Sequence, residues 1–275
     1  FAALGRKLTR DLDGDGVIDR YMIDMPAAGG FALGLLLLQR GVGTFDEQGR
    51  VAFDTPLTVE TMIWYLRQYY GKGRIAYEAG WGQSLMKALT DGLVLFIFAP
   101  DWRSFTTQSE LPHLAGKLKL MPLPAWESGG RRTSTWGGAG LAITKRCAKP
   151  ELAWELAKHL YLDKTDLGRR FASTNILPAL KDAWNLPEFQ RPSAYYSGQR
   201  VGALYAELAP DTPPVWSTPY RRVAEAKLGE AFLRAAEHYE RHGEDGLEEL
   251  IRAELAGARE YVQRLMDRNL LAREN

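Results

Sequence analysis

The chain has 275 residues, which is enough for one large domain or two small ones with a substantial core. Lysine and arginine total 35 and aspartate and glutamate total 34, so the formal net charge is +1. This balance argues against nucleic acid or an anionic membrane as the main partner, because both require a basic excess or a basic patch. The single cysteine, Cys147, excludes a disulfide framework or a cysteine zinc cluster within the chain.

No targeting or membrane segment is visible in the sequence. The longest apolar run, residues 31–38, is far shorter than the roughly 20 residues of a membrane helix. The sequence starts at Phe1 without a basic and apolar leader. We therefore expect a processed chain or a fragment, with any targeting information upstream of it.

Alternating helix and strand patterns run along the chain. Apolar residues at spacings of three and four predict helices, and short apolar or alternating runs bounded by Gly or Pro predict strands. Helices are expected at 31–39, 56–70, 84–90, 150–160, 165–173, 224–239 and 247–265, and strands at 51–53, 93–99, 117–123 and 140–144. Mixed helices and strands with long connections indicate an α/β fold.

An aspartate-rich loop near the N-terminus matches most of an EF-hand-like calcium loop. The pattern requires oxygen ligands at positions one, three, five, seven and nine and a glycine at six. The matching ligands are Asp11, Asp13, Asp15, the carbonyl of Val17, and Asp19. Met22 replaces the bidentate glutamate of position twelve, which predicts weak binding of a structural calcium ion. The alternative is a polar turn held by its own side-chain to backbone hydrogen bonds.

The eight tryptophans fall into two groups. Trp64, Trp154 and Trp184 lie in helical stretches, where core packing is expected. The others lie in loops or at strand ends: Trp81, Trp102, Trp126, Trp136 and Trp216. Aromatic faces beside charged groups suit a sugar ring, whose C–H faces stack while its hydroxyls form hydrogen bonds. The alternative for each is that it caps a hydrophobic cluster.

Catalytic patterns are sparse. His238 and His242 stand four apart on a predicted helix, but no HExxH motif accompanies them, and a solvated helix face is favoured. The sequence contains no nucleophile elbow, no Walker loop and no dinucleotide fingerprint after a strand. A glycosidase carboxylate pair cannot be assigned from sequence spacing. These observations favour a binding protein over an enzyme.

The order of motifs resembles the extracellular solute-binding proteins of ABC importers, the family of maltose-binding and multiple-sugar-binding proteins. The landmarks include the Asp-Gly-Asp-Gly loop, the Ala-Pro-Asp-Trp turn ending at Trp102, and the Trp-Gly-Gly turn at Trp136. In chain order they occupy residues 8–16, 39–49, 51–54, 93–102, 120–124, 136–143 and 149–154, followed by paired C-terminal helices. Each motif alone is weak, but their succession is specific.

The resemblance implies a periplasmic-binding-protein-like fold with two α/β lobes and a solute in the cleft between them. Residues 1–143 would form the first part of the second lobe. Residues 144–187 would cross into the first lobe, and residues 188–275 would return to the second lobe with the C-terminal helices. Most of the first lobe would be missing from this chain.

The resemblance also implies site residues. Trp102 and Tyr220 fall where the family has stacking aromatics, and Trp136 with Gly137 and Gly138 falls at a cleft-facing turn. Four further residues are placed by their proximity to these motifs: Asp101, Arg103, Trp216 and Trp81. Asp101 and Arg103 are expected to bond sugar hydroxyls.

The expected function is therefore extracytoplasmic binding of a sugar or oligosaccharide, without chemistry, for an ABC importer whose permease is the membrane partner. The location would be the periplasm or the outer face of the cell membrane, with a lipoprotein anchor. Some alginate-type relatives carry a calcium loop, which favours calcium as a structural ion here. The alternatives are a sugar-active hydrolase and a calcium-stabilised extracellular interaction module.

Overall fold

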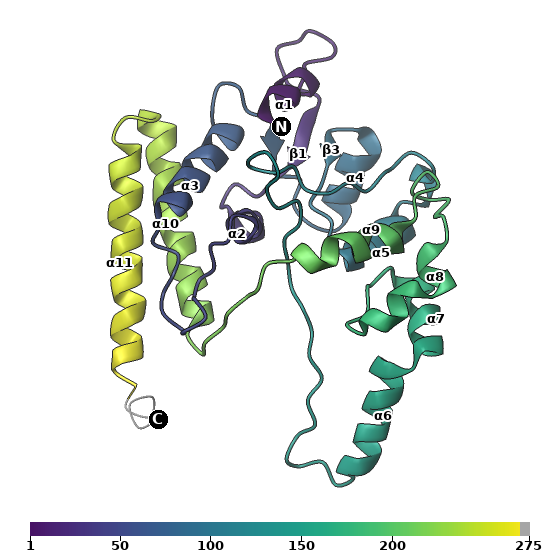
Figure 1. The fold of residues 1–275 in the computed structure, drawn as a ribbon. Coiled ribbons are helices and arrows are strands. Elements are labelled where there is room, and N and C mark those ends of the chain that lie inside the picture. The colour runs from purple at the N-terminus through teal and green to yellow at the C-terminus, as the bar shows by residue number, and fades with distance from the viewer. Residues whose placement is uncertain (270–275) are drawn as a thin grey trace. The chain divides into compact units, whose positions relative to one another are not determined.

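The computed structural model describes residues 1–269, which divide into two compact units (Figure 1). Unit 1 comprises Phe1–Phe98, Pro124–Ser134 and the chain from Pro213 onward. Unit 2 comprises Ala99–Leu123 and Thr135–Thr212. This division does not test the lobe assignment of residues 1–143, 144–187 and 188–275, which stays a prediction.

Unit 1 is built on a three-stranded parallel sheet in the order β2-β1-β3. The strands are β1 (Tyr21–Asp24), β2 (Ala76–Tyr77) and β3 (Val94–Phe96). Ile23 of the central strand is in register with Ala76 on one side and Phe96 on the other. All four residues of β1 are buried, as expected for a central parallel strand covered on both faces.

Helices make the connections that parallel strands require. Helices α2 (Gly30–Gln39) and α3 (Pro56–Tyr69) lie between β1 and β2 in the chain, and α4 (Gln83–Asp91) lies between β2 and β3. All three agree with the predicted helices. The sheet and its crossovers are the α/β element of this chain.

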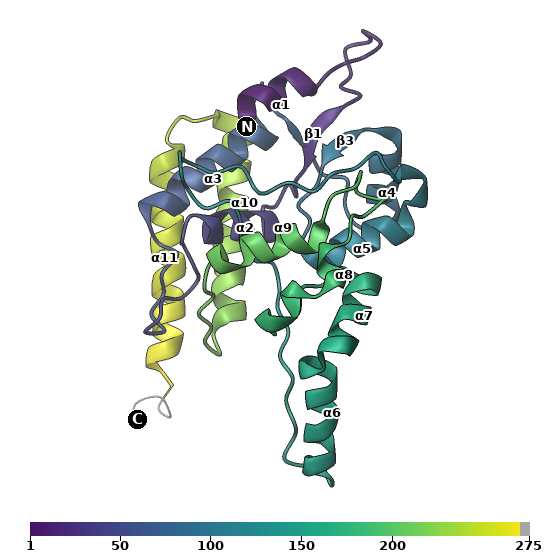
Figure 2. The ribbon, with the colours of Figure 1, turned by 45° about the vertical axis from the view of Figure 1, so that its right-hand side comes forward.

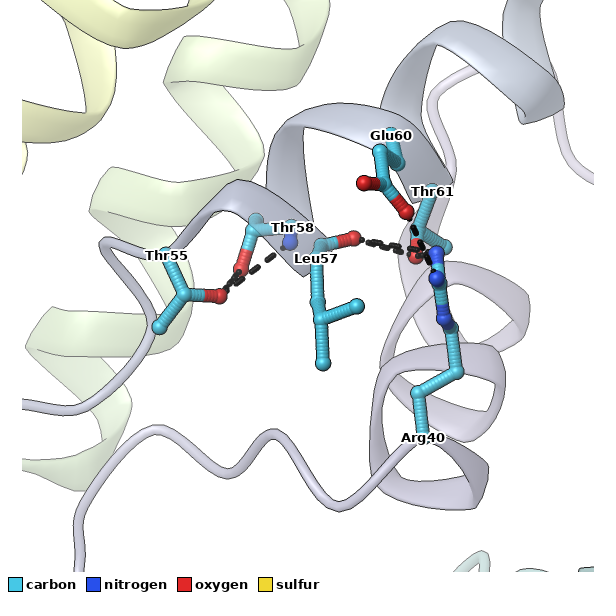
Figure 3. A network of polar contacts seen from close by, with 6 residues as sticks. All are labelled: Arg40, Thr55, Leu57, Thr58, Glu60 and Thr61. Atoms are coloured by element: carbon cyan, nitrogen blue, oxygen red, sulfur yellow. Dashed lines mark hydrogen bonds and ion pairs between the residues drawn. The ribbon is translucent and has the colours of Figure 1, made fainter.

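Polar contacts tie the end of α2 to the start of α3 (Figure 3). Thr55 caps α3 by accepting the Thr58 backbone N–H at 3.2 Å. Arg40, which follows α2, reaches the first turns of α3. Its guanidinium donates to the Leu57 carbonyl, the Thr61 hydroxyl and the Glu60 carboxylate at 3.3, 2.9 and 2.7 Å. These contacts fix where the two helices meet.

The remaining helices of unit 1 are α1 (Ala2–Leu8), α10 (Arg221–His242) and α11 (Leu247–Asp267). Figures 1 and 2 show α10 and α11 side by side, and the two helices pack on each other. The buried face of α11 consists of residues spaced three and four apart, namely Leu247, Ile251, Leu255, Ala258 and Val262. The predicted amphipathic pair is confirmed.

Unit 2 is helical. Its elements are α5 (Asp101–Glu110), η1 (Pro112–Leu114), α6 (Pro150–Leu162), α7 (Lys164–Thr174), η2 (Lys181–Asn185), α8 (Pro187–Gln190), α9 (Val201–Leu208) and η3 (Ala209–Asp211). One core cluster packs Phe171 on Phe189 with ring centroids 4.2 Å apart. A second cluster surrounds Tyr195, Tyr196 and Val201.

Three predicted strands are wrong. In the 51–53 segment only Val51 pairs, by an isolated bridge to Phe45. In the 117–123 segment the Gln199 side-chain amide accepts the Leu120 backbone N–H at 2.7 Å and donates to the Leu120 carbonyl at 2.8 Å. This side chain forms the hydrogen bonds that a neighbouring strand would form. The 140–144 segment is extended and exposed, and it joins no sheet among the described residues.

The core prediction for three tryptophans is partly wrong. Trp64 packs edge-on against Trp126, and Trp184 donates its indole N–H to the Pro178 carbonyl. Trp154, on α6, is exposed instead of lying in the core. Across residues 1–269, no helix is both long and apolar enough to cross a membrane.

Candidate functional site

The first turn of α5 carries three of the predicted site residues. Pro100 precedes the helix, and its carbonyl accepts the Arg103 and Ser104 backbone N–H groups at 3.0 and 3.3 Å. Asp101 lies at the positive end of the helix, where a carboxylate is favoured. This turn fixes the direction in which Trp102 leaves the helix.

Both carboxylate oxygens of Asp101 are engaged by backbone groups. Oδ1 accepts the Trp102 N–H at 2.8 Å, and Oδ2 accepts the Leu177 N–H at 3.0 Å. Leu177 follows α7, so Asp101 joins the start of α5 to a segment of unit 2 that is 76 residues further along the chain. The geometry makes Asp101 a positioning residue for Trp102.

Trp102 and Trp136 form an aromatic pair within unit 2. Their ring centroids lie 5.5 Å apart with an interplanar angle of 59°, and both side chains are half-buried. Gly137 and Gly138 follow Trp136 with φ of 108° and 136°, a region that favours glycine. A Cβ placed on either glycine would meet no atom within 4 Å, so the space beside this turn is open.

Arg103 lies behind this pair. Its side chain is 3% exposed, and its guanidinium carbon is 6.0 Å from the Trp136 ring centroid, at the limit of a cation–π contact. The expected bond from Arg103 to a ligand hydroxyl has no support from this burial. The Arg103 guanidinium lies near the Trp136 ring, and its bond to a ligand hydroxyl stays a prediction.

Two buried tyrosines of unit 2 donate hydrogen bonds to carbonyl groups in α5 and at its C-terminal end. The Tyr196 hydroxyl donates to the Ser104 carbonyl at 2.5 Å, and the Tyr195 hydroxyl donates to the Leu111 carbonyl at 2.8 Å. Burial raises the pKa of the Tyr196 hydroxyl well above its ordinary value, so the group stays a neutral donor. The Tyr-Tyr pair in an otherwise polar loop is the sequence signal that could have indicated this role.

Three predicted site residues lie in unit 1. Trp81 is exposed between β2 and α4, with its ring centroid 6.0 Å from that of Phe31. Trp216 is exposed and its backbone forms a bridge with Phe45. Tyr220 is half-buried at the start of α10, and its N–H donates to the Thr218 hydroxyl at 3.2 Å. Phe31, the partner of Trp81, was not predicted.

The aspartate loop in unit 1 is closed by a backbone bridge between Arg10 and Arg20. The carboxylate oxygens of Asp11, Asp13 and Asp15 lie within 4.8 Å of one another, a spacing compatible with a hard cation. Asp19 lies outside this group, and its carboxylate accepts the Leu12 N–H at 2.7 Å.

Backbone N–H groups also stabilise the loop. Asp11 accepts the N–H groups of Gly16 and Gly14, at 2.8 and 2.6 Å, and these bonds lower the pKa of its carboxyl group. Val17 donates its N–H to Asp15, and the role of its carbonyl as a ligand stays a prediction. The loop thus has both the carboxylate cluster of a calcium site and the bonds of a self-held turn, and calcium binding stays a prediction.

Residues 7–196 match the model of a protein family described as bacterial extracellular solute-binding protein. The chain belongs to that family. This agrees with the prediction that it is a binding protein and not an enzyme. An arabinooligosaccharide-binding protein of Halalkalibacterium halodurans is 29% identical over 165 residues, which are 58% of this chain and 37% of the relative.

Solved structures of binding proteins share the fold. The maltose/maltodextrin-binding domain MalE from Bdellovibrio bacteriovorus, bound to maltotriose, has a TM-score of 0.68 at 17% identity. The match covers 96% of this chain and 65% of that domain. UgpB from Mycobacterium tuberculosis, in complex with glycerophosphocholine, has a TM-score of 0.65 at 16% identity, covering 98% and 62%.

These likenesses confirm the α/β periplasmic-binding-protein fold. The chain spans less than half of the curated relative's length and about two thirds of the maltodextrin-binding domain. For a solute-binding protein, the useful surface is one that offers contact area and directional hydrogen bonds instead of reactive groups. In unit 2 the half-buried pair Trp102 and Trp136 offers aromatic contact area, and its role in binding stays a prediction.

Proposed function

We propose that this solute-binding protein binds a neutral oligosaccharide for uptake by an ABC importer, and that Trp102 and Trp136 stack on the sugar rings of this ligand. The observation that carries the proposal is the tilted, half-buried aromatic pair at the start of α5. Two aromatic faces at an angle can contact the apolar C–H faces of two successive sugar units.

The open backbone turn beside the pair supports the same proposal. Gly137 and Gly138 carry no side chain, and the space that a Cβ would enter is empty. A ligand can therefore approach the backbone closely, so that hydroxyl groups exchange hydrogen bonds with peptide groups. Peptide groups suit polyhydroxylated ligands because they offer both donors and acceptors.

The charges near the pair favour a neutral ligand over a phosphodiester. Arg103 is buried behind Trp136, and Asp101 has both oxygens engaged by backbone N–H groups. A phosphate group is bound by exposed cations or by clustered N–H donors, and neither charged residue of this turn presents one. The known ligands of two similar proteins, an arabinooligosaccharide and maltotriose, are neutral.

The remaining elements of the proposal follow from the family. An extracellular binding protein delivers its solute to a membrane permease, and hinge closure around the solute is the usual signal. Trp81 with Phe31, Trp216 and Tyr220 are candidate contacts from unit 1. The Asp11 loop is a candidate structural calcium site, because calcium accepts the clustered carboxylates of Asp11, Asp13 and Asp15.

A titration panel tests the ligand class. The protein is titrated calorimetrically with arabinotriose, maltotriose and glycerophosphocholine. We expect saturable binding of at least one trisaccharide and none of glycerophosphocholine. Binding of glycerophosphocholine alone would contradict the neutral-sugar proposal, and binding of none of the three would contradict the wider assignment to oligosaccharide uptake.

A further inference from the structure

Two histidines lie near the C-terminal end of α10 and take no part in the proposed sugar site. His242 is the last residue of this helix, and His238 lies one turn before it. Side chains four residues apart on a helix are neighbours on one face. The ring centroids of His238 and His242 are 4.9 Å apart, with an interplanar angle of 45°. His242 is exposed and His238 is half-buried, so a solute ion can reach the pair from solvent.

The separation of the two rings fits two imidazoles bound to one metal ion. A zinc–nitrogen bond of about 2.1 Å places the centroid of a ligating imidazole about 3.2 Å from the metal. Two such rings at a nitrogen–metal–nitrogen angle of about 90–110° have centroids about 4.5–5.2 Å apart. The observed separation of 4.9 Å lies within this range. The helix therefore places the rings at the spacing of a two-histidine metal site.

A hydrogen bond at one nitrogen of His238 assigns the tautomer of the ring. Nε2 of His238 lies 2.6 Å from the backbone carbonyl oxygen of Asp245. A carbonyl oxygen only accepts hydrogen bonds, so Nε2 carries the hydrogen and Nδ1 of the neutral ring carries the lone pair. Metal-ligating histidines have this arrangement, because their second nitrogen donates to a carbonyl or a carboxylate. His238 is thus oriented with its lone pair on Nδ1, the nitrogen that binds a metal.

The turn between α10 and α11 brings the Asp245 carbonyl to His238. Gly243 ends α10 with φ of 67°, and Gly246 precedes α11 with φ of 64°, a region that favours glycine. The chain reverses between these glycines, and α11 runs back alongside α10 (Figure 1). The orientation of the His238 ring is therefore set by the fold of unit 1 and not only by its own helix.

The charges around the pair favour a cation. Residues 237–245 contain one guanidinium group and four carboxylates, those of Glu237, Glu240, Glu244 and Asp245. The guanidinium, of Arg241, pairs with Glu237 at 4.0 Å. Glu244 pairs with Arg67 at 2.5 Å. The histidines also lie in the last turns of α10, where the helix dipole favours positive charge. A divalent ion at the two rings gains from the carboxylates and from the helix end.

We propose that His238 and His242 form a surface site for a divalent transition-metal ion of the class of Zn²⁺ and Cu²⁺. Imidazole nitrogen suits these ions, whereas Ca²⁺ and Mg²⁺ prefer oxygen ligands. Among residues 1–269 no third His, Cys, Asp or Glu forms a cluster with the pair, so water fills the remaining coordination positions. Two protein ligands bind more weakly than the four of a closed structural site. The site shares no residue with the proposed sugar surface or with the Asp11 loop, so it goes beyond both proposals.

Titration with zinc tests the site. The protein is titrated calorimetrically with ZnCl₂ at about pH 7.5, where imidazole is mostly neutral, and millimolar Ca²⁺ is present to compete for the carboxylates of the Asp11 loop. We expect zinc to bind with a micromolar dissociation constant. His242→Gln should weaken this binding at least about tenfold, because it removes a nitrogen ligand.

The matched control is His113→Gln, at an exposed histidine that has no second histidine four residues away. This variant should bind zinc as the wild type does. Equal zinc binding by the wild type and His242→Gln would overturn the proposal, and so would a wild type that binds no zinc. A loss in His113→Gln as large as that in His242→Gln would also overturn it.

Electron paramagnetic resonance of bound Cu²⁺ provides the second test, because it distinguishes nitrogen ligands from oxygen ligands. With one equivalent of Cu²⁺ we expect splitting from two ligand nitrogens in the wild type and from one in His242→Gln. The far-ultraviolet circular dichroism of this variant should match that of the wild type, because glutamine is a good helix former. A wild-type spectrum with oxygen ligands alone would overturn the proposal, whatever the outcome of the sugar titrations.

Discussion

The carboxylate of Asp101 accepts the backbone N–H of Leu177 at 3.0 Å, and this bond joins two segments of unit 2 that are 76 residues apart in sequence. The other oxygen of the same carboxylate holds the Trp102 N–H at 2.8 Å. The residue that carries the proposed stacking ring is therefore positioned by a bond network that involves the segment after α7. The ligand surface depends on this internal bond as well as on the ring itself.

Removing the Asp101 carboxylate should destabilise unit 2. We expect Asp101→Ala to lower the free energy of unfolding by about 1–3 kcal/mol, because the Leu177 N–H loses its acceptor. Asp101→Asn should lower it less, since one acceptor oxygen remains. Urea unfolding of the purified variants measures both effects.

A matched control is Asp182→Ala, at an exposed residue whose ion pair with Lys164 is 3.6 Å long. Exposed pairs contribute about 0–1 kcal/mol, so this variant should resemble the wild type. Equal decreases in the free energy of unfolding for Asp101→Ala and Asp182→Ala would show that the hydrogen bond from Leu177 to Asp101 contributes no more than an exposed ion pair.

The aromatic pair should be coupled in ligand binding. We expect Trp102→Ala to weaken trisaccharide binding at least tenfold, which corresponds to about 1.4 kcal/mol. Trp136→Ala should also weaken it, and the double variant should lose less than the sum, because the two rings touch each other and the same ligand. A double-mutant cycle of dissociation constants measures the coupling. Strict additivity would indicate that the rings act separately.

Several elements were predictable because their signals are local. Pro56 after the Thr55 cap predicts the start of α3, and the three-and-four spacing from Leu247 to Val262 predicts α11. Trp102 beside a strand end was likewise a local signal. The bond to Leu177 and the burial of Arg103 were not predictable, because they depend on segments that meet only after folding.

The incorrect predictions have physical causes too. Residues 117–123 have a strand pattern, but Gln199 supplies the hydrogen bonds that a neighbouring strand would give. Trp154 has the pattern of a core residue, yet it is 53% exposed in the structure. Periodicity shows which face of an element is to be buried and does not show which partner buries it.

Calcium should stabilise the aspartate loop. We expect millimolar Ca²⁺ to raise the Tm of the protein, because it relieves repulsion among the carboxylates of Asp11, Asp13 and Asp15. Asp13→Asn should remove most of the increase by reducing the ligand charge. Differential scanning calorimetry with CaCl₂ and with a chelator measures the shift.

The control for calcium is a second aspartate turn in unit 1. Asp46 accepts the backbone N–H groups of Gln48 and Arg50 but belongs to no carboxylate cluster among the described residues. Asp46→Asn should change the Tm equally with and without calcium. A wild-type Tm that does not change with Ca²⁺ would contradict calcium binding and indicate a turn held only by its own side-chain to backbone hydrogen bonds.

Acid should weaken the start of α7. Asp163 caps this helix by accepting the Asp166 N–H at 3.0 Å, and this bond holds the pKa of the Asp163 carboxyl group below its ordinary value. A lowered pKa in the folded state means that the stabilisation is present above the unfolded pKa of about 3.9 and is lost as the pH falls through the folded value.

The urea midpoint should therefore decrease between about pH 5 and pH 3. Asp163→Asn keeps a capping oxygen but cannot titrate. We expect this variant to match the wild type at pH 7 and to lose less stability in acid. An identical decrease of the urea midpoint in both proteins would show that Asp163 does not contribute to the loss of stability in acid.

The central claim is that Trp102 and Trp136 contact the sugar. The most direct measurement is ¹⁹F NMR of the protein labelled with 5-fluorotryptophan, titrated with arabinotriose and maltotriose, with signals assigned by single Trp→Phe variants. We expect the Trp102 and Trp136 signals to shift saturably with the bound sugar, while the signal of Trp184, whose indole N–H is bonded to the Pro178 carbonyl, keeps its position. Saturable sugar binding that leaves both Trp102 and Trp136 signals unchanged would contradict the account.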